Sequence, residues 1–165
     1  MNEDAYAEWL VKRKDPPYAI PVKVLMVILC IISAYLALNT LVGVIVLALA
    51  GAATYFVFIN LNVEYEYLFV EGDLSIDRIL ARSRRKKLLE CKKEEIQIVA
   101  PSDSYVLKDY EKGGMKVTDC SSRQAGVKTY ALIYQRGPEC MKVIFEPNDR
   151  VLRSMRHAIP SKVVR

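Results

Sequence analysis

The stretch VLMVILCIISAYLALNTLVGVIVLALAGAATYFVFINLNV occupies residues 24–63 and contains no Asp, Glu, Lys or Arg. These 40 consecutive uncharged residues are too many for the core of a soluble domain in a chain of 165 residues. As one straight helix they would measure about 60 Å, roughly twice the thickness of the hydrocarbon core of a bilayer. The stretch therefore predicts two membrane-spanning helices.

The polar pair Asn39-Thr40 is the natural break between the two spans, because both side chains compete with helical hydrogen bonding. We therefore predict a transmembrane hairpin at residues 22–61. Its two spans are expected at 22–38 and 41–59. A cleaved signal peptide with its apolar core at 24–33 is the alternative for the first span. The second span would anchor the chain in either case.

The flanks of the hairpin predict its orientation. Basic residues precede the first span, none lies between the spans, and they resume at Arg78. By the positive-inside rule we expect a two-span protein of the cell membrane with both termini in the cytoplasm. The basic residues before the spans are Lys12, Arg13, Lys14 and Lys23.

Residues 1–21 are predicted to form a cytoplasmic leader. Tyr6, Trp9 and Leu10 have helical spacing, and Pro16-Pro17 would end such a helix. A short helix in the membrane interface and a disordered lead both fit this pattern.

Residues 62–165 are predicted to form one small cytoplasmic domain. Its segment 64–165 carries 20 basic and 15 acidic residues, which accounts for the whole net charge of +5. Hydrophobic residues alternate from Val63 to Phe69, with Glu64 and Glu66 on the opposite face of the expected strand. Further strands are expected at 74–82, 87–91, 96–100, 116–120, 127–135 and 140–145.

The pattern becomes helical after Pro147. Asn148 is the expected N-cap, and Pro160 ends the helix. Its buried stripe is predicted to consist of Val151, Leu152, Met155 and Ile159. The predicted fold is a membrane α-helical hairpin plus an α+β domain, an antiparallel PH-like β-barrel or sandwich closed by the C-terminal helix. A six-stranded meander or sandwich with a packed helix would give the same pattern.

The sequence shows no catalytic, metal or cofactor motif. The four cysteines match no zinc or redox spacing, and the single histidine, His157, has no nucleophile motif beside it. The chain also lacks a Walker loop and a GxGxxG segment. We therefore expect no enzyme activity, no cofactor and no metal.

The chain resembles small clostridial membrane proteins that have two spans. The resemblance lies in the leader segment 8–14, in the run from Tyr65 through Gly72-Asp73-Leu74, and in the segment 145–148. More distantly it resembles bacterial PH-like domains attached to paired transmembrane helices. The resemblance implies an interaction module and no catalytic residue.

The strongest local signal outside the spans is a cluster of basic residues between positions 82 and 93, here called the basic hairpin. It contains seven basic residues and one acidic residue, Glu90. They are Arg82, Arg84, Arg85, Lys86, Lys87, Lys92 and Lys93. Their position near the spans predicts contact with anionic lipid headgroups or with a protein partner. A solvated turn that resists edge pairing is the alternative, and no nucleic acid is expected because aromatic residues are not interleaved.

These observations favour a nonenzymatic membrane-anchored adaptor or scaffold. Its PH-like domain would bind a protein partner or the anionic membrane surface. The alternative is an accessory subunit of a larger membrane transport or secretion complex that acts through its two spans.

Overall fold

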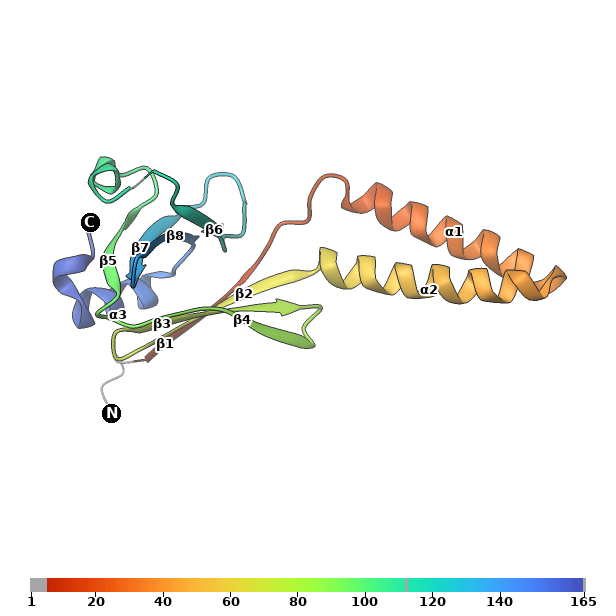
Figure 1. Ribbon diagram of the computed structural model, residues 1–165, viewed down its shortest axis with the longest axis horizontal. Coiled ribbons are helices and arrows are strands. Elements are labelled where there is room, and N and C mark those ends of the chain that lie inside the picture. The colour runs from red at the N-terminus through yellow and green to blue at the C-terminus, as the bar shows by residue number, and fades with distance from the viewer. Residues whose placement is uncertain (1–5, 112, 165) are drawn as a thin grey trace. The chain divides into compact units, whose positions relative to one another are not determined.

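A computed structural model of the chain describes residues 6–111 and 113–164 (Figure 1). They form two compact units. The helical unit contains residues 14–63 together with 80–84, and the sheet unit contains the described residues of 1–13, 64–79 and 85–165.

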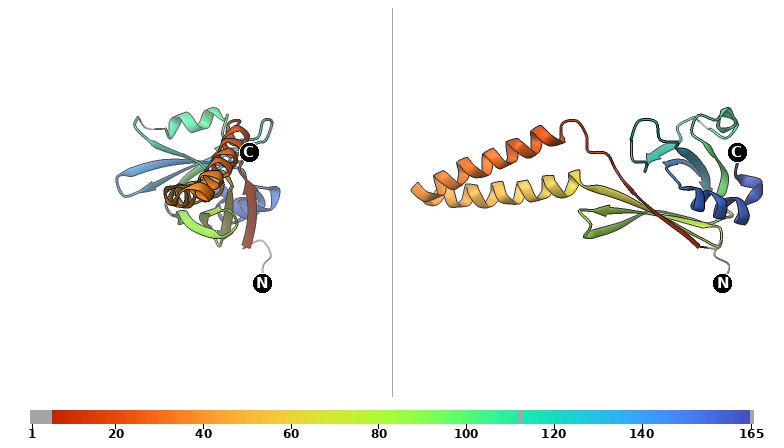
Figure 2. Two further views of the ribbon diagram at one scale, coloured as in Figure 1. Left: turned by 90° about the vertical axis from the view of Figure 1, so that its right-hand side faces the viewer. Right: turned by 180° about the vertical axis from the view of Figure 1, so that it is seen from behind.

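The helical unit contains two long apolar helices, α1 (Ala19–Asn39) and α2 (Leu41–Leu61), which pack side by side (Figure 2, right). Each has 21 residues and is long and apolar enough to cross a membrane. Thr40 separates the helices, and its hydroxyl accepts a hydrogen bond from the Gly43 N–H at 3.1 Å. The predicted break at Asn39-Thr40 is confirmed.

Gly43 permits the tight connection between the helices. A Cβ atom at this position would lie 2.3 Å from the carbonyl carbon of Leu36. No side chain larger than hydrogen fits there without moving backbone, so this glycine sets how closely α1 and α2 approach.

The sheet unit contains two four-stranded sheets, and it includes all seven strands predicted after residue 62. The first sheet has the order β1 (Tyr6–Lys12), β2 (Val63–Val70), β3 (Asp73–Leu80), β4 (Arg84–Cys91). The second has the order β5 (Ile96–Pro101), β7 (Tyr130–Arg136), β8 (Glu139–Phe145), β6 (Lys116–Asp119). Short 3-10 helices lie at Tyr105–Asp109 and Pro160–Lys162.

The N-terminal segment differs from the prediction of an interfacial helix or a disordered lead. It forms β1, which pairs antiparallel with β2 from Tyr6 opposite Val70 to Lys12 opposite Glu64. Ala7 and Val11 are buried. A strand is stabilised by a partner elsewhere in the chain, so the local spacing of Tyr6, Trp9 and Leu10 did not reveal it. The two helices are thus inserted between neighbouring strands, and the sheet domain does not begin at residue 62.

Two features of the sheets differ from an antiparallel barrel, which was predicted as one of two alternatives beside a sandwich. Strand β6 pairs with β8 in parallel, whereas β7 pairs antiparallel with both β5 and β8. The described strands form two separate sheets and no closed barrel. In the second sheet β8 lies between β7 and β6, so β6 pairs with the edge of β8 opposite to β7.

Tyr67 and Phe145 join the two sheets in the core. Their rings pack edge to face with centroids 5.7 Å apart. The Tyr67 hydroxyl donates to the carbonyl of Cys120 at 2.6 Å and accepts from the N–H of Glu146 at 3.3 Å. The fully buried hydroxyl of Tyr67 is therefore satisfied both as a hydrogen-bond donor and as an acceptor.

The C-terminal helix α3 (Asp149–Ala158) begins as predicted, because the Asn148 side chain accepts a hydrogen bond from the Val151 N–H at 2.8 Å. The predicted stripe is also confirmed: Val151, Leu152, Met155 and Ile159 are all buried. The helix therefore packs its apolar side inside the sheet unit and leaves its arginines exposed.

Candidate functional site: the basic hairpin

Strands β3 and β4 form the hairpin, and β4 is an edge strand of the first sheet. The tip between them is tight: Ala81 and Arg82 have φ values of 47° and 57°, and the Ser83 N–H donates to the carbonyl of Leu80 at 3.1 Å. Left-handed backbone at two non-glycine residues is uncommon and occurs mainly in turns.

This tip belongs to the helical unit. The Ala81 N–H donates to the carbonyl of Asn62, directly after α2, at 2.9 Å. Asn62 is the C-cap of α2, where backbone carbonyls lack partners inside the helix. The hydrogen bond therefore places the tip, with Arg82 and Arg84, beside the C-terminal end of α2.

The basic residues along β4 are partly neutralised. The guanidinium of Arg85 lies 2.6 Å from Glu66 and 3.8 Å from Asp77. Glu66 is only 8% exposed, and burial raises its pKa although Arg85 opposes that effect. Arg85 is thus the counter-charge of a buried carboxylate. The alternating sequence pattern had predicted that Glu66 lies on the face opposite the hydrophobic residues, and its burial was not expected.

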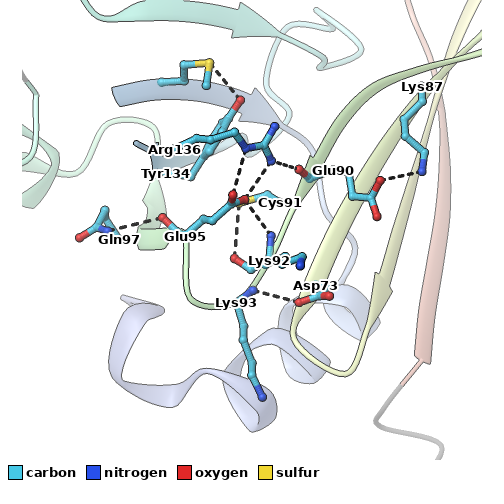
Figure 3. A network of polar contacts seen from close by, with 11 residues as sticks. Asp73, Lys87, Glu90, Cys91, Lys92, Lys93, Glu95, Gln97, Tyr134 and Arg136 are labelled. Carbon is cyan, nitrogen blue, oxygen red and sulfur yellow. Dashed lines mark hydrogen bonds and ion pairs between the residues drawn. The ribbon is translucent and has the colours of Figure 1, made fainter. Parts of the chain in front are cut away.

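Lys87 is also paired. Its Nζ lies 2.8 Å from Oε2 of Glu90, an ion pair drawn in Figure 3. Lys86 lies between Arg85 and Lys87 in the strand, is exposed, and has no acidic partner among the described residues. The exposed pair of Lys87 and Glu90 contributes little to stability.

Lys92 and Lys93 lie at the other end of β4, in the turn that leads to β5. Their backbone N–H groups donate to Glu95 at 3.1 Å and to Asp73 at 3.0 Å. The Lys93 side chain covers Gly72, where a Cβ would lie 3.0 Å from the Lys93 Cβ and φ is +107°. The positive φ favours glycine at that position, and a larger residue would also press on the Lys93 side chain.

An arginine from another hairpin closes the same turn (Figure 3). The guanidinium of Arg136 donates to both carboxylate oxygens of Glu95 at 2.9 Å and also to the backbone carbonyl of Glu90. The Arg136 hydrogen bond is the main reason that the pKa of Glu95 is lowered to about 2. This contact fastens the β7–β8 hairpin to the turn between β4 and β5.

The structure therefore separates the seven predicted residues into three groups. Arg82 and Arg84 lie at the tip in the helical unit, Arg85, Lys86 and Lys87 lie along β4, and Lys92 and Lys93 lie in the distal turn. Sequence reasoning missed the acidic partners Glu66 and Asp77. It also missed Asn62, since no local signal marks which backbone carbonyl a distant turn will contact.

The side chains that could support chemistry are dispersed. Cys91 and Cys120 are buried, and burial raises the pKa of each thiol to about 12, so both are protonated at neutral pH. His157 is exposed on α3. Among residues 6–111 and 113–164, no group of three His, Cys, Asp or Glu side chains is placed to hold a metal ion.

The chain thus combines two helices that are long and apolar enough to cross a membrane with a two-sheet domain and a C-terminal helix. A family model described as a bacterial PH-like domain (DUF6106) matches residues 3–165. Because the match covers nearly the whole chain, the protein belongs to this family. Neither the curated proteins nor the solved structures contain a match to the chain.

Proposed function

We propose that the protein is a nonenzymatic membrane-anchored adaptor whose PH-like domain binds a protein partner or the anionic surface of the membrane. The chain lies in the cell membrane with two spans, and both termini face the cytoplasm. In this proposal α3 closes one end of the PH-like domain. The protein uses no cofactor and binds no nucleic acid.

The hydrogen bond between Ala81 and Asn62 is the observation that carries this proposal. It lies within the helical unit and brings the tip of the basic hairpin to the end of a helix that is long enough to span a bilayer. Polar residues at such an end lie at the depth of the lipid headgroups. Arg82 and Arg84 are both exposed there.

The basic charge of the helical unit lies at one end of the helix pair. Because α1 and α2 are antiparallel neighbours, the start of α1 and the end of α2 lie together. Lys14 and Lys23 flank the start of α1, with Lys23 paired to Asp15 at 3.0 Å. The opposite end, around Asn39 and Thr40, carries no charged residue. This asymmetry supports the cytoplasmic orientation.

The proposal can be tested on the full-length chain in nanodiscs that contain phosphatidylcholine with or without phosphatidylglycerol. Native mass spectrometry would count the phosphatidylglycerol molecules retained by the protein. Each basic residue near an anionic surface contributes roughly 1 kcal/mol, so R82Q/R84Q should weaken retention about 30-fold. Retention should also decrease as salt rises.

The matched control is K108Q/K116Q, which removes two exposed lysines of the sheet unit. It should leave retention within about twofold of wild type. Equal losses from both variants would indicate nonspecific attraction and would exclude the tip as the lipid contact. Crosslinking and mass spectrometry of native membranes then identifies the protein partner, and crosslinks confined to α1 and α2 would instead favour an accessory subunit acting through its spans.

A further inference from the structure

A pocket of about 360 Å³ lies within the sheet unit beside α3, and no residue of the basic hairpin lines it. Three cationic side chains line it, two from α3 and one from the loop before β7. Its charged and polar lining consists of Lys128, Tyr130, Asp149, Arg153 and Arg156. The volume lies within the range of small-molecule sites.

The periodicity of α3 brings its contribution to the pocket together. Asp149, Arg153 and Arg156 are separated by four and three residues, so they follow one strip along the helix. Leu152 also lines the pocket and is buried, so this part of α3 packs against the core. The strip therefore presents two guanidinium groups to the pocket beside Leu152.

These cations have no acidic partner among the described residues. Arg153, Arg156 and Lys128 form no ion pair, although Asp149 lies only one turn from Arg153. By contrast, other cations of the sheet unit are paired, such as Arg85 with Glu66 and Arg136 with Glu95. The pocket consequently holds three positive charges and one negative charge.

We propose that this pocket binds a phosphate monoester. A phosphate monoester carries a charge of about −1.5 to −2 at neutral pH, which matches the net charge of +2 in the pocket. Planar guanidinium groups can donate two parallel hydrogen bonds to phosphate oxygens, and a lysine adds a point charge. The Tyr130 hydroxyl supplies a neutral donor.

Asp149 adds a second element of recognition. A carboxylate repels phosphate but accepts a hydrogen bond from a hydroxyl group. The preferred ligand is therefore a phosphate monoester with a neighbouring hydroxyl, rather than inorganic phosphate. Such a group occurs free in solution or at a membrane surface as a lipid headgroup, and the experiment separates these two sources.

The soluble arm uses the full-length chain in phosphatidylcholine nanodiscs, titrated with glycerol 3-phosphate in a calorimeter. R153Q should weaken binding at least tenfold. R150Q is the matched control, because Arg150 is an exposed arginine of the same helix that does not line the pocket. It should leave the affinity within about twofold, and D149N should tighten the binding of inorganic phosphate.

The lipid arm uses nanodiscs that contain lysophosphatidic acid, a phosphate monoester with a free neighbouring hydroxyl, and retention is measured by native mass spectrometry. Loss of retention in R153Q but not in R82Q/R84Q would place a lipid phosphate in the pocket. The reverse result would assign that lipid to the basic hairpin and leave only the soluble ligand for the pocket.

The proposal is wrong if neither glycerol 3-phosphate nor lysophosphatidic acid binds saturably, or if R150Q and R153Q lose affinity equally. Unchanged thermal unfolding of R153Q would show that the substitution acts on the pocket and not on the fold. The soluble arm does not depend on whether the hairpin tip contacts lipid, so the two proposals can fail separately.

Discussion

At the scale of single residues, a few polar side chains connect segments that lie far apart in the sequence. Tyr67 links β2 to the backbone at Cys120 and Glu146, and Arg136 links the β7–β8 hairpin to Glu95. Buried polar groups without partners are costly, so these contacts favour one arrangement of the two sheets over others.

The pair of Arg136 and Glu95 predicts a pH dependence. The pKa of Glu95 lies near 2, below its ordinary value of 4.5. Ionised Glu95 therefore stabilises the fold above about pH 4.5, and this contribution is lost as the pH falls towards 2. In R136Q the pKa should return towards 4.5, and the difference in stability from wild type should shrink between pH 4.5 and 2. Carboxyl NMR and urea unfolding across this range measure both effects.

At the scale of elements, β1 and α3 are held in place by two different kinds of interaction. Strand β1 depends on its pairing with β2, whereas α3 depends on its apolar stripe. The helices α1 and α2 expose most of their apolar side chains within the described structure, as expected for elements that face lipid.

Met155 tests the packing of α3, because its side chain has no exposed surface. M155D would bury an unpaired carboxylate and should cost on the order of 5 kcal/mol, comparable to the whole stability of a small domain. Cooperative urea unfolding, followed by the fluorescence of Trp9 in β1, should be lost. R150D on the exposed side of α3 should change stability by less than about 0.5 kcal/mol. A normal transition in M155D would contradict the packing.

The insertion of the helices between β1 and β2 predicts that they can be removed. Since Lys12 lies opposite Glu64, replacing residues 13–63 by Asn-Gly should close an ordinary two-residue hairpin. The resulting protein should be soluble and should unfold cooperatively.

The control is the fragment 64–165, which lacks β1 and leaves β2 with an unpaired edge. It should be less stable or should aggregate, because exposed strand edges promote association. If both proteins behave alike, β1 contributes no stability to the sheet.

At the scale of the whole molecule, the distribution of charge predicts how the chain lies in the membrane. Cys140 is partly exposed, whereas Cys91 and Cys120 are buried thiols with pKa values near 12. A membrane-impermeant maleimide should therefore leave intact cells unlabelled and should modify Cys140 after permeabilisation.

The matched variant L38C places a thiol at the exposed end of α1, next to the break between the helices. It should be labelled in intact cells, and C140S should remove labelling after permeabilisation. Labelling of Cys140 before permeabilisation would reverse the proposed orientation.

The sequence by itself determined the features that depend on neighbours in the chain. The uncharged run predicted two helices and their break at Asn39-Thr40, and the spacing of Val151, Leu152 and Met155 predicted the buried side of α3. Both patterns repeat within a few residues, because a helix makes its hydrogen bonds locally.

Only the tertiary structure decided which distant segments meet. It recruited residues 6–12 as a strand, paired β6 in parallel with β8, and buried Glu66 beneath Arg85. It also gathered Lys128 and Arg153 around one pocket and brought Ala81 to Asn62. Strand partners and ion pairs are chosen by contacts between remote residues, and the local pattern at either partner does not contain that information.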